Sequence, residues 1–268
     1  MFEGNRNLYH LMQENDNEKL YVITQFLLSY ASHLMGCGVH TSRVIRNTRR
    51  IGEAYGYDVE LCVFTQHIIG TVKDVDLHLQ TTETVEVQHL PINFEHNARL
   101  SSLSWTCYDE KIDFEELLHR YEHIISTPRL SRVNTLLMAS AANAAFCQLF
   151  GGDALSILIV FLATAVAFYF RGFLAAHRLN NYLQVLLTAF VASIFTSVAL
   201  CCNTTSEIAL ATSVLFLVPG VPLINGVIDA IEGHVLTGIT RLINGLLIIV
   251  CLAFGLGLTL IITKGGLL

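Results

Sequence analysis

Residues 215–241 read LFLVPGVPLINGVIDAIEGHVLTGITR, and this stretch decides the fold. Two prolines, Pro219 and Pro222, flank Gly220 inside an otherwise apolar run. Proline lacks the backbone N–H and clashes with the preceding turn, so the helix should break here. Counted from Glu207 at 1.5 Å per residue, the break lies about 18 Å along the segment. That is slightly past the middle of a hydrocarbon core about 30 Å thick. Broken backbone at that depth must lie within protein or beside a water-filled cavity.

Polar residues follow the break at helical spacing. Asn225 and Asp229 are four residues apart and Glu232 comes three later, so the three can share one helix face. Ionisable groups in membrane segments are costly and usually face a pathway or a partner. Three interpretations stay open: a transport pathway, solvated carboxylates at the cytoplasmic edge, and a structural ion pair with Arg241. The predicted transport-pathway residues are Pro219, Gly220, Pro222, Asn225, Asp229, Glu232, His234 and Arg241.

The charge distribution divides the chain into two parts. Residues 1–130 hold 11 of the 16 Lys and Arg residues and 18 of the 22 Asp and Glu residues. After Pro128, five apolar segments can be read, at about 134–150, 154–170, 182–202, 208–219 and 242–263. Spanning helices need about 20 apolar residues. We therefore predict a soluble α+β domain at 1–128 and a membrane α-helical bundle of about five transmembrane helices at 129–268, one of them broken at Pro-Gly-x-Pro.

Charges at the segment ends predict the orientation. Arg129, Arg132, Arg171, Arg178 and Arg241 fall on one side, whereas Asp153 and Glu207 fall in the alternate loops and Lys264 is the exception. The positive-inside rule then puts the N-terminal domain in the cytoplasm and the C-terminus outside. Residues 1–17 are polar and mixed in charge, so no signal peptide is expected there.

The first 128 residues alternate between helical and strand patterns. We expect helices at 21–35, at about 41–55 with Thr41 or Ser42 as the cap and Gly56 as the end, at 92–106, and at 113–126 with Asp113 as N-cap and Glu116 as its N3 acid. Strands are expected at 58–65, 67–73, 75–81 and 84–90, with a turn at Lys73-Asp74.

Chemistry in the soluble half is weakly marked. Glu115, His119 and His123 share one helix face and could ligate a metal, but a solvated face is favoured. The seven cysteines are scattered without a CxxC pair, so no metal or cofactor is predicted. No phosphate loop or nucleophile elbow is present, so an enzyme is not expected. The acidic balance argues against nucleic-acid binding.

A family resemblance is carried by two stretches. LVPGVPLINGVIDAIEGHVLTGITR, at 217–241, is similar to the signature of the threonine/serine exporter family, especially its short split-gene members. GCGVHTSRVIRNTRRIGEAYG, at 36–56, resembles the turn and basic helix of that family's soluble domain. The resemblance covers about residues 21–260. It implies the bacterial inner membrane and export of small amino acids such as threonine and serine or, for some split members, of dicarboxylates such as succinate.

The resemblance also implies a partner, because the family's longer members carry a second membrane domain that this chain lacks. An odd number of spans means that a fused second copy would be inverted, as in many transporters. We therefore expect a second small membrane subunit of the same family, or self-association. The leading hypothesis is a secondary exporter subunit coupled to an ion or proton gradient through Asp229. The alternatives are a membrane-anchored enzyme with a catalytic soluble domain, and a regulatory or assembly subunit of a transporter.

Overall fold

The computed structural model describes residues 16–88, 90–128, 130–202 and 204–265. Contacts group the chain into two compact units. Unit 1 comprises Met1–Thr127 and Val221–Leu242, and unit 2 comprises Pro128–Gly220 and Ile243–Leu268. Arg129, most of the polar N-terminal stretch and the side chain of Lys264, which entered the predictions above, lie outside the described parts.

Unit 1 contains a three-stranded antiparallel sheet in the order β1-β2-β3. β1 (Tyr57–Val63) and β2 (His67–Asp74) pair with Tyr57 opposite Asp74, and β2 pairs with β3 (Leu79–Glu86) with His67 opposite Glu86. Burial alternates along β2, where Ile68, Gly70 and Val72 are buried and the intervening Ile69 and Thr71 are more exposed. This alternation means that one face of the sheet packs on the core.

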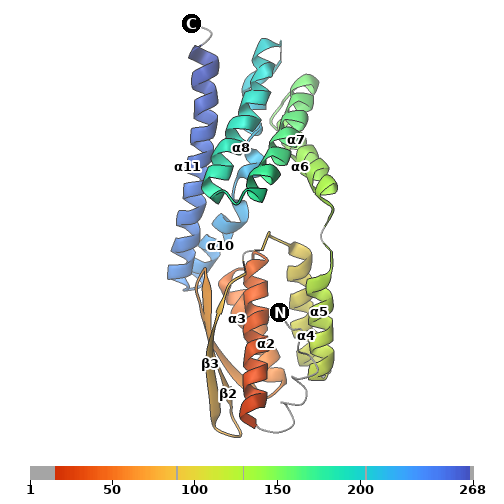
Figure 1. Ribbon diagram of the computed structural model, residues 1–268, viewed down its shortest axis with the longest axis vertical. Coiled ribbons are helices and arrows are strands. Elements are labelled where there is room, and N and C mark those ends of the chain that lie inside the picture. The colour runs from red at the N-terminus through yellow and green to blue at the C-terminus, as the bar shows by residue number, and fades with distance from the viewer. Residues whose placement is uncertain (1–15, 89, 129, 203, 266–268) are drawn as a thin grey trace. The chain divides into compact units, whose positions relative to one another are not determined.

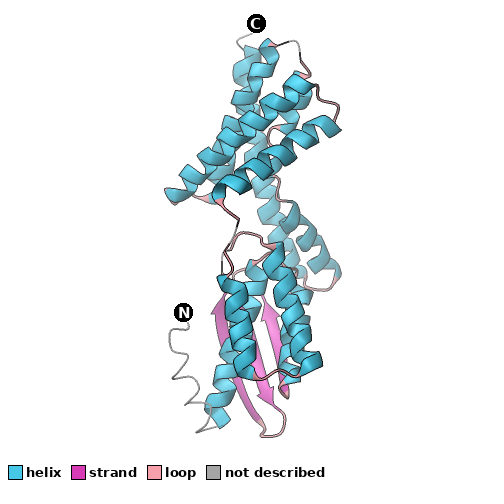
Figure 2. Ribbon diagram, turned by 90° about the vertical axis from the view of Figure 1, so that its right-hand side faces the viewer, coloured by secondary structure: helices cyan, strands magenta, loops and turns pink. Residues whose placement is uncertain are grey.

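Four helices cover that face in two layers (Figures 1 and 2). α2 (Asp16–Gly36) packs on β2 and β3, and α3 (Thr41–Ala54) packs on β1. α4 (Phe94–Glu110) packs on α3, and α5 (Phe114–Ser126) packs on α4. The largest fully buried side chains of the core come from α2 and α5, with Phe26, Tyr30 and Tyr121 in mutual ring contact.

Two of the predicted strands are wrong. Instead of strands at 75–81 and 84–90, the structure has the single strand β3, and residues 75–78 form a turn. The Asp74 carboxylate accepts the N–H groups of Asp76 and Leu77, both at 3.1 Å, and His78 has a positive φ of 54°. An aspartate that satisfies the backbone two and three residues later favours a turn over a continued strand.

The predicted helix ends are largely confirmed. Asp113 caps α5 by accepting the N–H of Glu115, and Gly56 has the positive φ of 83° expected after a helix. The Glu116 side chain does not reach back to complete a capping box; it pairs with Arg120 at 2.6 Å. The prediction that Thr41 or Ser42 caps α3 is wrong. The N-cap residue is His40, and its side chain makes no capping hydrogen bond.

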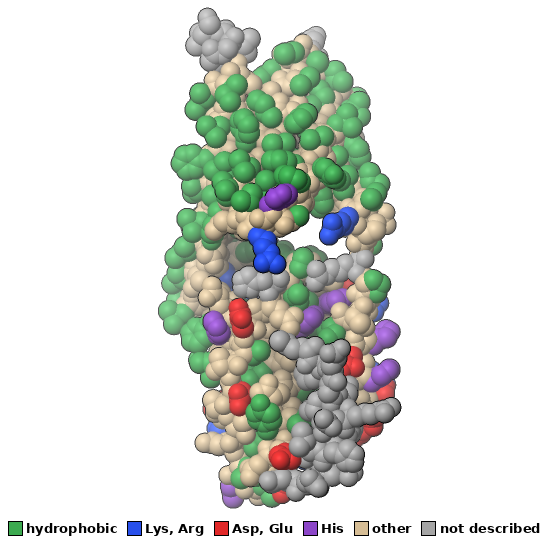
Figure 3. All heavy atoms as spheres, viewed as in Figure 1, with side chains coloured by type: hydrophobic (Ala, Val, Ile, Leu, Met, Phe, Trp, Pro, Cys, Tyr) green, Lys and Arg blue, Asp and Glu red, His purple; other side chains and the backbone are tan. Residues whose placement is uncertain are grey.

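All regular secondary structure in the described residues of unit 2 is helical. It contains α6 (Arg132–Leu149), α7 (Ala154–Ala176), α8 (Asn181–Thr196), η1 (Ser197–Cys201), α9 (Ser206–Thr212), η2 (Leu215–Leu217) and the C-terminal part of α11 (Val235–Gly265). Hydrophobic side chains cover much of its visible surface (Figure 3). A soluble helical unit would show a polar outer face instead.

Three described helices are long and apolar enough to cross a membrane, at Ala154–Ala176, Asn181–Cys201 and Val235–Thr263. A fourth candidate is the interrupted pair Ser206–Leu217 and Gly220–Ile231. The fold is thus mostly helical, with three or four candidate spans and a small sheet in the N-terminal part. The first segment predicted as a span forms α6 but is not among these candidates, and the count of five stays a prediction.

Candidate transport site

The helix breaks at the predicted prolines. η2 ends at Leu217 and α10 (Gly220–Ile231) begins after Pro219. Pro219 is buried, and Pro222 occupies the third position of α10, where the missing N–H costs no helical hydrogen bond. Gly220 has open space at its Cβ position. The interruption therefore follows from the prolines.

Two glycines bring α10 and the start of α11 into close contact. A Cβ atom at Gly238 would lie 2.7 Å from the Gly226 carbonyl oxygen and 2.8 Å from the Ala230 nitrogen. A Cβ at Gly226 would in turn lie 3.0 Å from the Gly238 oxygen. Backbones approach this closely only where small residues face each other. The hairpin of α10 and α11 is thus held at a fixed separation.

Asp229 is the centre of the site. It lies on α10, is fully buried, and its Oδ1 accepts the backbone N–H of Thr41 at 2.7 Å. Thr41 is the first residue of α3, so the carboxylate of Asp229 satisfies one of the N–H groups that a helix leaves unpaired at its start. The Asp229 carboxylate thus caps the N-terminus of α3, as an N-cap side chain normally would, although it lies 188 positions away in the sequence.

Arg241 supplies the opposite charge. Its Nη1 lies 3.2 Å from Asp229 Oδ2, as an ion pair that is not aligned as a hydrogen bond. Its Nη2 donates to the Val39 carbonyl oxygen at 3.0 Å and contacts Met35 Sδ at 2.8 Å. The Arg241 side chain is 11% exposed and that of Asp229 0%. A charge pair this buried must be compensated locally, because each ion alone would cost several kcal/mol.

Residues 38–41, which we call the clasp loop, receive further contacts from α10. Asn225 Nδ2 donates to the Gly38 carbonyl oxygen at 2.8 Å, and Asn225 is 9% exposed. Glu232, just past the end of α10, pairs with His40 at 3.2 Å and is partly exposed. A hydrogen bond from Ser42, with the nearby charge of His40, lowers the pKa of the Glu232 carboxyl.

The structure therefore brings together four of the predicted residues: Asn225, Asp229, Glu232 and Arg241 all contact the clasp loop or one another. His234 takes part through its backbone, whose N–H donates to the Asp229 carbonyl oxygen at 2.8 Å. The interpretation of Asp229 as a solvated carboxylate is wrong, because its side chain is fully buried. The structure pairs Asp229 with Arg241, and the transport-pathway role stays a prediction.

The clasp loop itself was missed as part of the site. Its contributions are mostly backbone groups, which carry no residue-specific signal. The hint in the sequence was the stretch at 36–56, a small-residue turn followed by a basic helix, which carries the family resemblance together with the α10 segment. Gly38 has a φ of 91°, so the loop needs glycine there to present its carbonyl to Asn225.

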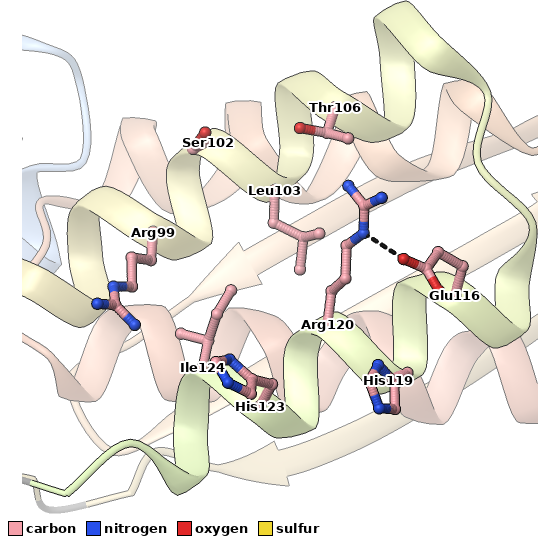
Figure 4. A pocket seen from close by; sticks show the side chains of 9 residues that line it. All are labelled: Arg99, Ser102, Leu103, Thr106, Glu116, His119, Arg120, His123 and Ile124. Carbon is pink, nitrogen blue, oxygen red and sulfur yellow. Dashed lines mark hydrogen bonds and ion pairs between the residues drawn. The ribbon is translucent and has the colours of Figure 1, made fainter.

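A hollow with a volume of about 460 Å³ lies between α4 and α5, away from Asp229 (Figure 4). Figure 4 shows Arg120 paired with Glu116, and Leu103 and Ile124 lying between Arg99 and Arg120. Arg99 is also paired, with Glu95 at 2.6 Å. His119 and His123 line the hollow, but Glu115, the third residue of the weak metal prediction, is not among its lining residues. Both arginines that line the hollow are thus paired with carboxylates of their own helices.

Comparisons with known proteins identify the family of the chain. Residues 25–263 match the ThrE family model, described as "Putative threonine/serine exporter". The chain is 30% identical to a protein of Klebsiella aerogenes named "Probable succinate transporter subunit YjjP", over 94% of this chain and 97% of that protein. It is 31% identical to the protein of the same name from Escherichia coli K12, over 84% of this chain and 88% of the relative. No solved structure matches the chain. The match of the family model over nearly the whole length, together with the apolar helices, shows that this multi-pass membrane protein belongs to the threonine/serine exporter family.

Proposed function

We propose that the chain is one subunit of a secondary exporter for small carboxylate-bearing solutes, either threonine and serine or a dicarboxylate such as succinate. Family membership supports export, and the relatives named as succinate transporter subunits support the dicarboxylate class. The observation that carries the mechanism is the fully buried carboxylate of Asp229, held by Arg241 and by the start of α3.

The donors around Asp229 are those that a free carboxylate ligand would use. A guanidinium binds carboxylates through charge and paired N–H groups, and the N–H groups at a helix start favour anions. Asp229 is therefore an internal carboxylate that occupies a carboxylate-binding position. When a substrate carboxylate enters, it competes with Asp229 for Arg241 and for the Thr41 N–H.

Protonation of Asp229 completes the exchange. A neutral carboxyl group gives up most of its attraction for Arg241, and the guanidinium then pairs with the substrate instead. We assign the incoming proton to Asp229 Oδ2, a buried oxygen that accepts no hydrogen bond. One proton taken up with one substrate carboxylate keeps the charge of the buried site constant, so proton and substrate cross together and export follows their combined gradient.

The proposed assembly has a second component. The relatives' names contain the word subunit, and the interrupted pair at 206–231 needs protein or a water cavity around its break. We propose that a second small membrane subunit of the same family, or a second copy of this chain, supplies that surface. The complex lies in the bacterial inner membrane with the N-terminal domain in the cytoplasm and the C-terminus outside.

The test is export from proteoliposomes that contain this chain with and without its candidate partner. Labelled serine, threonine and succinate are loaded, and a pH gradient is imposed. We expect export that needs both chains and falls at least about 100-fold in Asp229→Asn, a loss typical of a proton-transferring group. Glu207→Gln, an exposed carboxylate of the membrane half, is the matched control and should retain export.

The outcomes separate the alternatives. Undiminished, gradient-driven export by Asp229→Asn would refute the coupling role while leaving the exporter intact. Export by the partner alone would favour a regulatory or assembly role for this chain. Chemical conversion of a substrate by the full-length chain without any release would favour the membrane-anchored enzyme.

A further inference from the structure

Three potential metal ligands converge inside unit 1, away from Asp229. The side chains are His33, Cys37 and His96, and their nitrogen and sulfur ligand atoms all lie within 4.8 Å of one another. All three residues are buried, with exposed fractions of 8%, 1% and 4%. Among the described residues, this is the one group of three or more ligating side chains placed in this way.

The backbone fixes two of the ligands at helical spacing. His33 lies in the last turn of α2, and the Cys37 N–H donates to the His33 carbonyl oxygen at 2.9 Å. This bond extends the helical turn past Gly36, so that residues i and i+4 project to the same side. The end of α2 therefore places the side chains of His33 and Cys37 on the same side without any change of the backbone.

The third ligand is tied to the same turn. The Cys37 carbonyl oxygen accepts the N–H of Asn93 at 3.2 Å, and Asn93 caps α4 by accepting the N–H of His96 at 3.1 Å. Cys37 is thus linked through Asn93 to the first turn of α4, the helix that carries His96. The His33 and His96 rings are stacked at 6.2 Å, and the ring of Tyr121 meets His33 edge-on.

Two imidazoles and one thiolate form a donor set of a particular kind. Zinc and similar borderline-soft divalent ions favour nitrogen and sulfur ligands, whereas magnesium and calcium favour oxygen. Three protein ligands with a fourth position left for water or another donor are typical of non-structural zinc sites. Bonds of about 2.0–2.3 Å to one ion place ligand atoms under 4 Å apart, so small rotamer changes close this site.

We propose that His33, Cys37 and His96 bind one zinc-class divalent cation inside the N-terminal part of the chain. The Cys37 thiol releases its proton to solvent as the metal–sulfur bond forms, and no redox change is involved. The competing interpretation is a packed aromatic cluster beside a small apolar cysteine, which predicts no metal affinity.

The position of the site gives it a consequence. Cys37 immediately precedes the clasp loop, residues 38–41, which holds Asn225, Asp229 and Arg241. A metal that fixes the Cys37 side chain restrains the start of this loop. Occupancy should therefore stabilise the docking of α10 on α3, and it does so whether or not Asp229 couples transport to protons.

The experiment uses the purified full-length chain in detergent, stripped of metal and then titrated with Co²⁺. We expect one equivalent to bind, with a thiolate-to-cobalt charge-transfer band and visible bands of tetrahedral intensity, both displaced by Zn²⁺ and unaffected by Mg²⁺. Cys37→Ala should abolish the charge-transfer band, and His33→Ala or His96→Ala should weaken binding at least about 100-fold, more than loss of an outer-shell partner does. Cys62→Ala, an exposed cysteine, and the pair His119→Ala and His123→Ala are matched controls that should bind normally.

A measurement on the unmodified chain tests the proposed metal site even if the variants fail to fold. X-ray absorption of the zinc-loaded protein should show one sulfur at about 2.3 Å and two imidazole nitrogens at about 2.0 Å. The absence of saturable 1:1 binding, or a zinc shell without sulfur, would overturn the proposal. So would a cobalt thiolate band that survives in a folded Cys37→Ala variant.

Discussion

Replacing Gly238 by alanine tests whether close contact between α10 and α11 holds the site together. The added Cβ would lie 2.7 Å from the Gly226 oxygen and 2.8 Å from the Ala230 nitrogen, both backbone atoms that no rotamer change can move away. To reach an ordinary contact of 3.4 Å, the two backbones must separate by about 0.7 Å. Overpacking of this kind costs about 1–3 kcal/mol.

Alanine also has a favourable effect that must be subtracted. In a helix interior it is more stable than glycine by about 0.5–1 kcal/mol. The expected net loss for Gly238→Ala is therefore about 0–2.5 kcal/mol in the free energy of unfolding, with a midpoint of about 1 kcal/mol. Because Ala230 follows Asp229 directly, the same displacement pulls the carboxylate away from Arg241, and transport should fall together with stability.

The matched control lies on the same helix. A Cβ at Gly257 meets nothing within 4 Å, and the residue has no positive φ, so Gly257→Ala should be neutral or stabilising by up to about 1 kcal/mol. The assay is denaturant-induced unfolding of the detergent-solubilised chain, followed by circular dichroism. Equal effects of the two substitutions, or a more stable Gly238→Ala, would refute the reasoning.

Two further predictions concern charges. Arg241→Gln leaves Asp229 buried without its counter-ion and should lower the free energy of unfolding by about 3–5 kcal/mol. The double variant with Asp229→Asn should recover most of that loss in the same unfolding assay. Additive losses in the two single variants and the double variant would show that the pair is not coupled. Asp153, whose pKa is lowered to about 2 by hydrogen bonds from Ser156 and Thr205, stabilises the fold above its ordinary pKa of 3.8 and loses this contribution as the pH falls through about 2. The melting temperature of Asp153→Asn should therefore lie below that of the unmodified chain at pH 6 and approach it near pH 2, whereas a constant difference would contradict the assignment.

Much of the fold could be predicted because the signals are local. The helix break at Pro219 follows from a missing N–H, and the caps at Asp113 and Gly56 depend on a few neighbouring residues. The turn at 75–78 was missed because β-branched and alternating residues on both sides favour strand, while the decisive contact is one carboxylate, that of Asp74.

The candidate site could be predicted only in part, for a physical reason. The helical spacing of Asn225 and Asp229 identifies one side of the site, but the groups that hold them are backbone atoms of a distant loop. In the same way, His33 and Cys37 are visibly four residues apart, whereas His96 joins them only through the packing of α4. Contacts that depend on tertiary structure leave no pattern in a single sequence.

Unit 1 is completed by residues 221–242, although its other members come from the first 127 residues. During synthesis, the sheet and helices α2–α5 therefore leave the ribosome about a hundred residues before the hairpin that they must receive. Until then, the N-terminus of α3 lacks the Asp229 carboxylate that caps it in the finished molecule. The N-terminal region can therefore reach its finished contacts only after α10 has been synthesised, and a chain truncated before α10 would lack them.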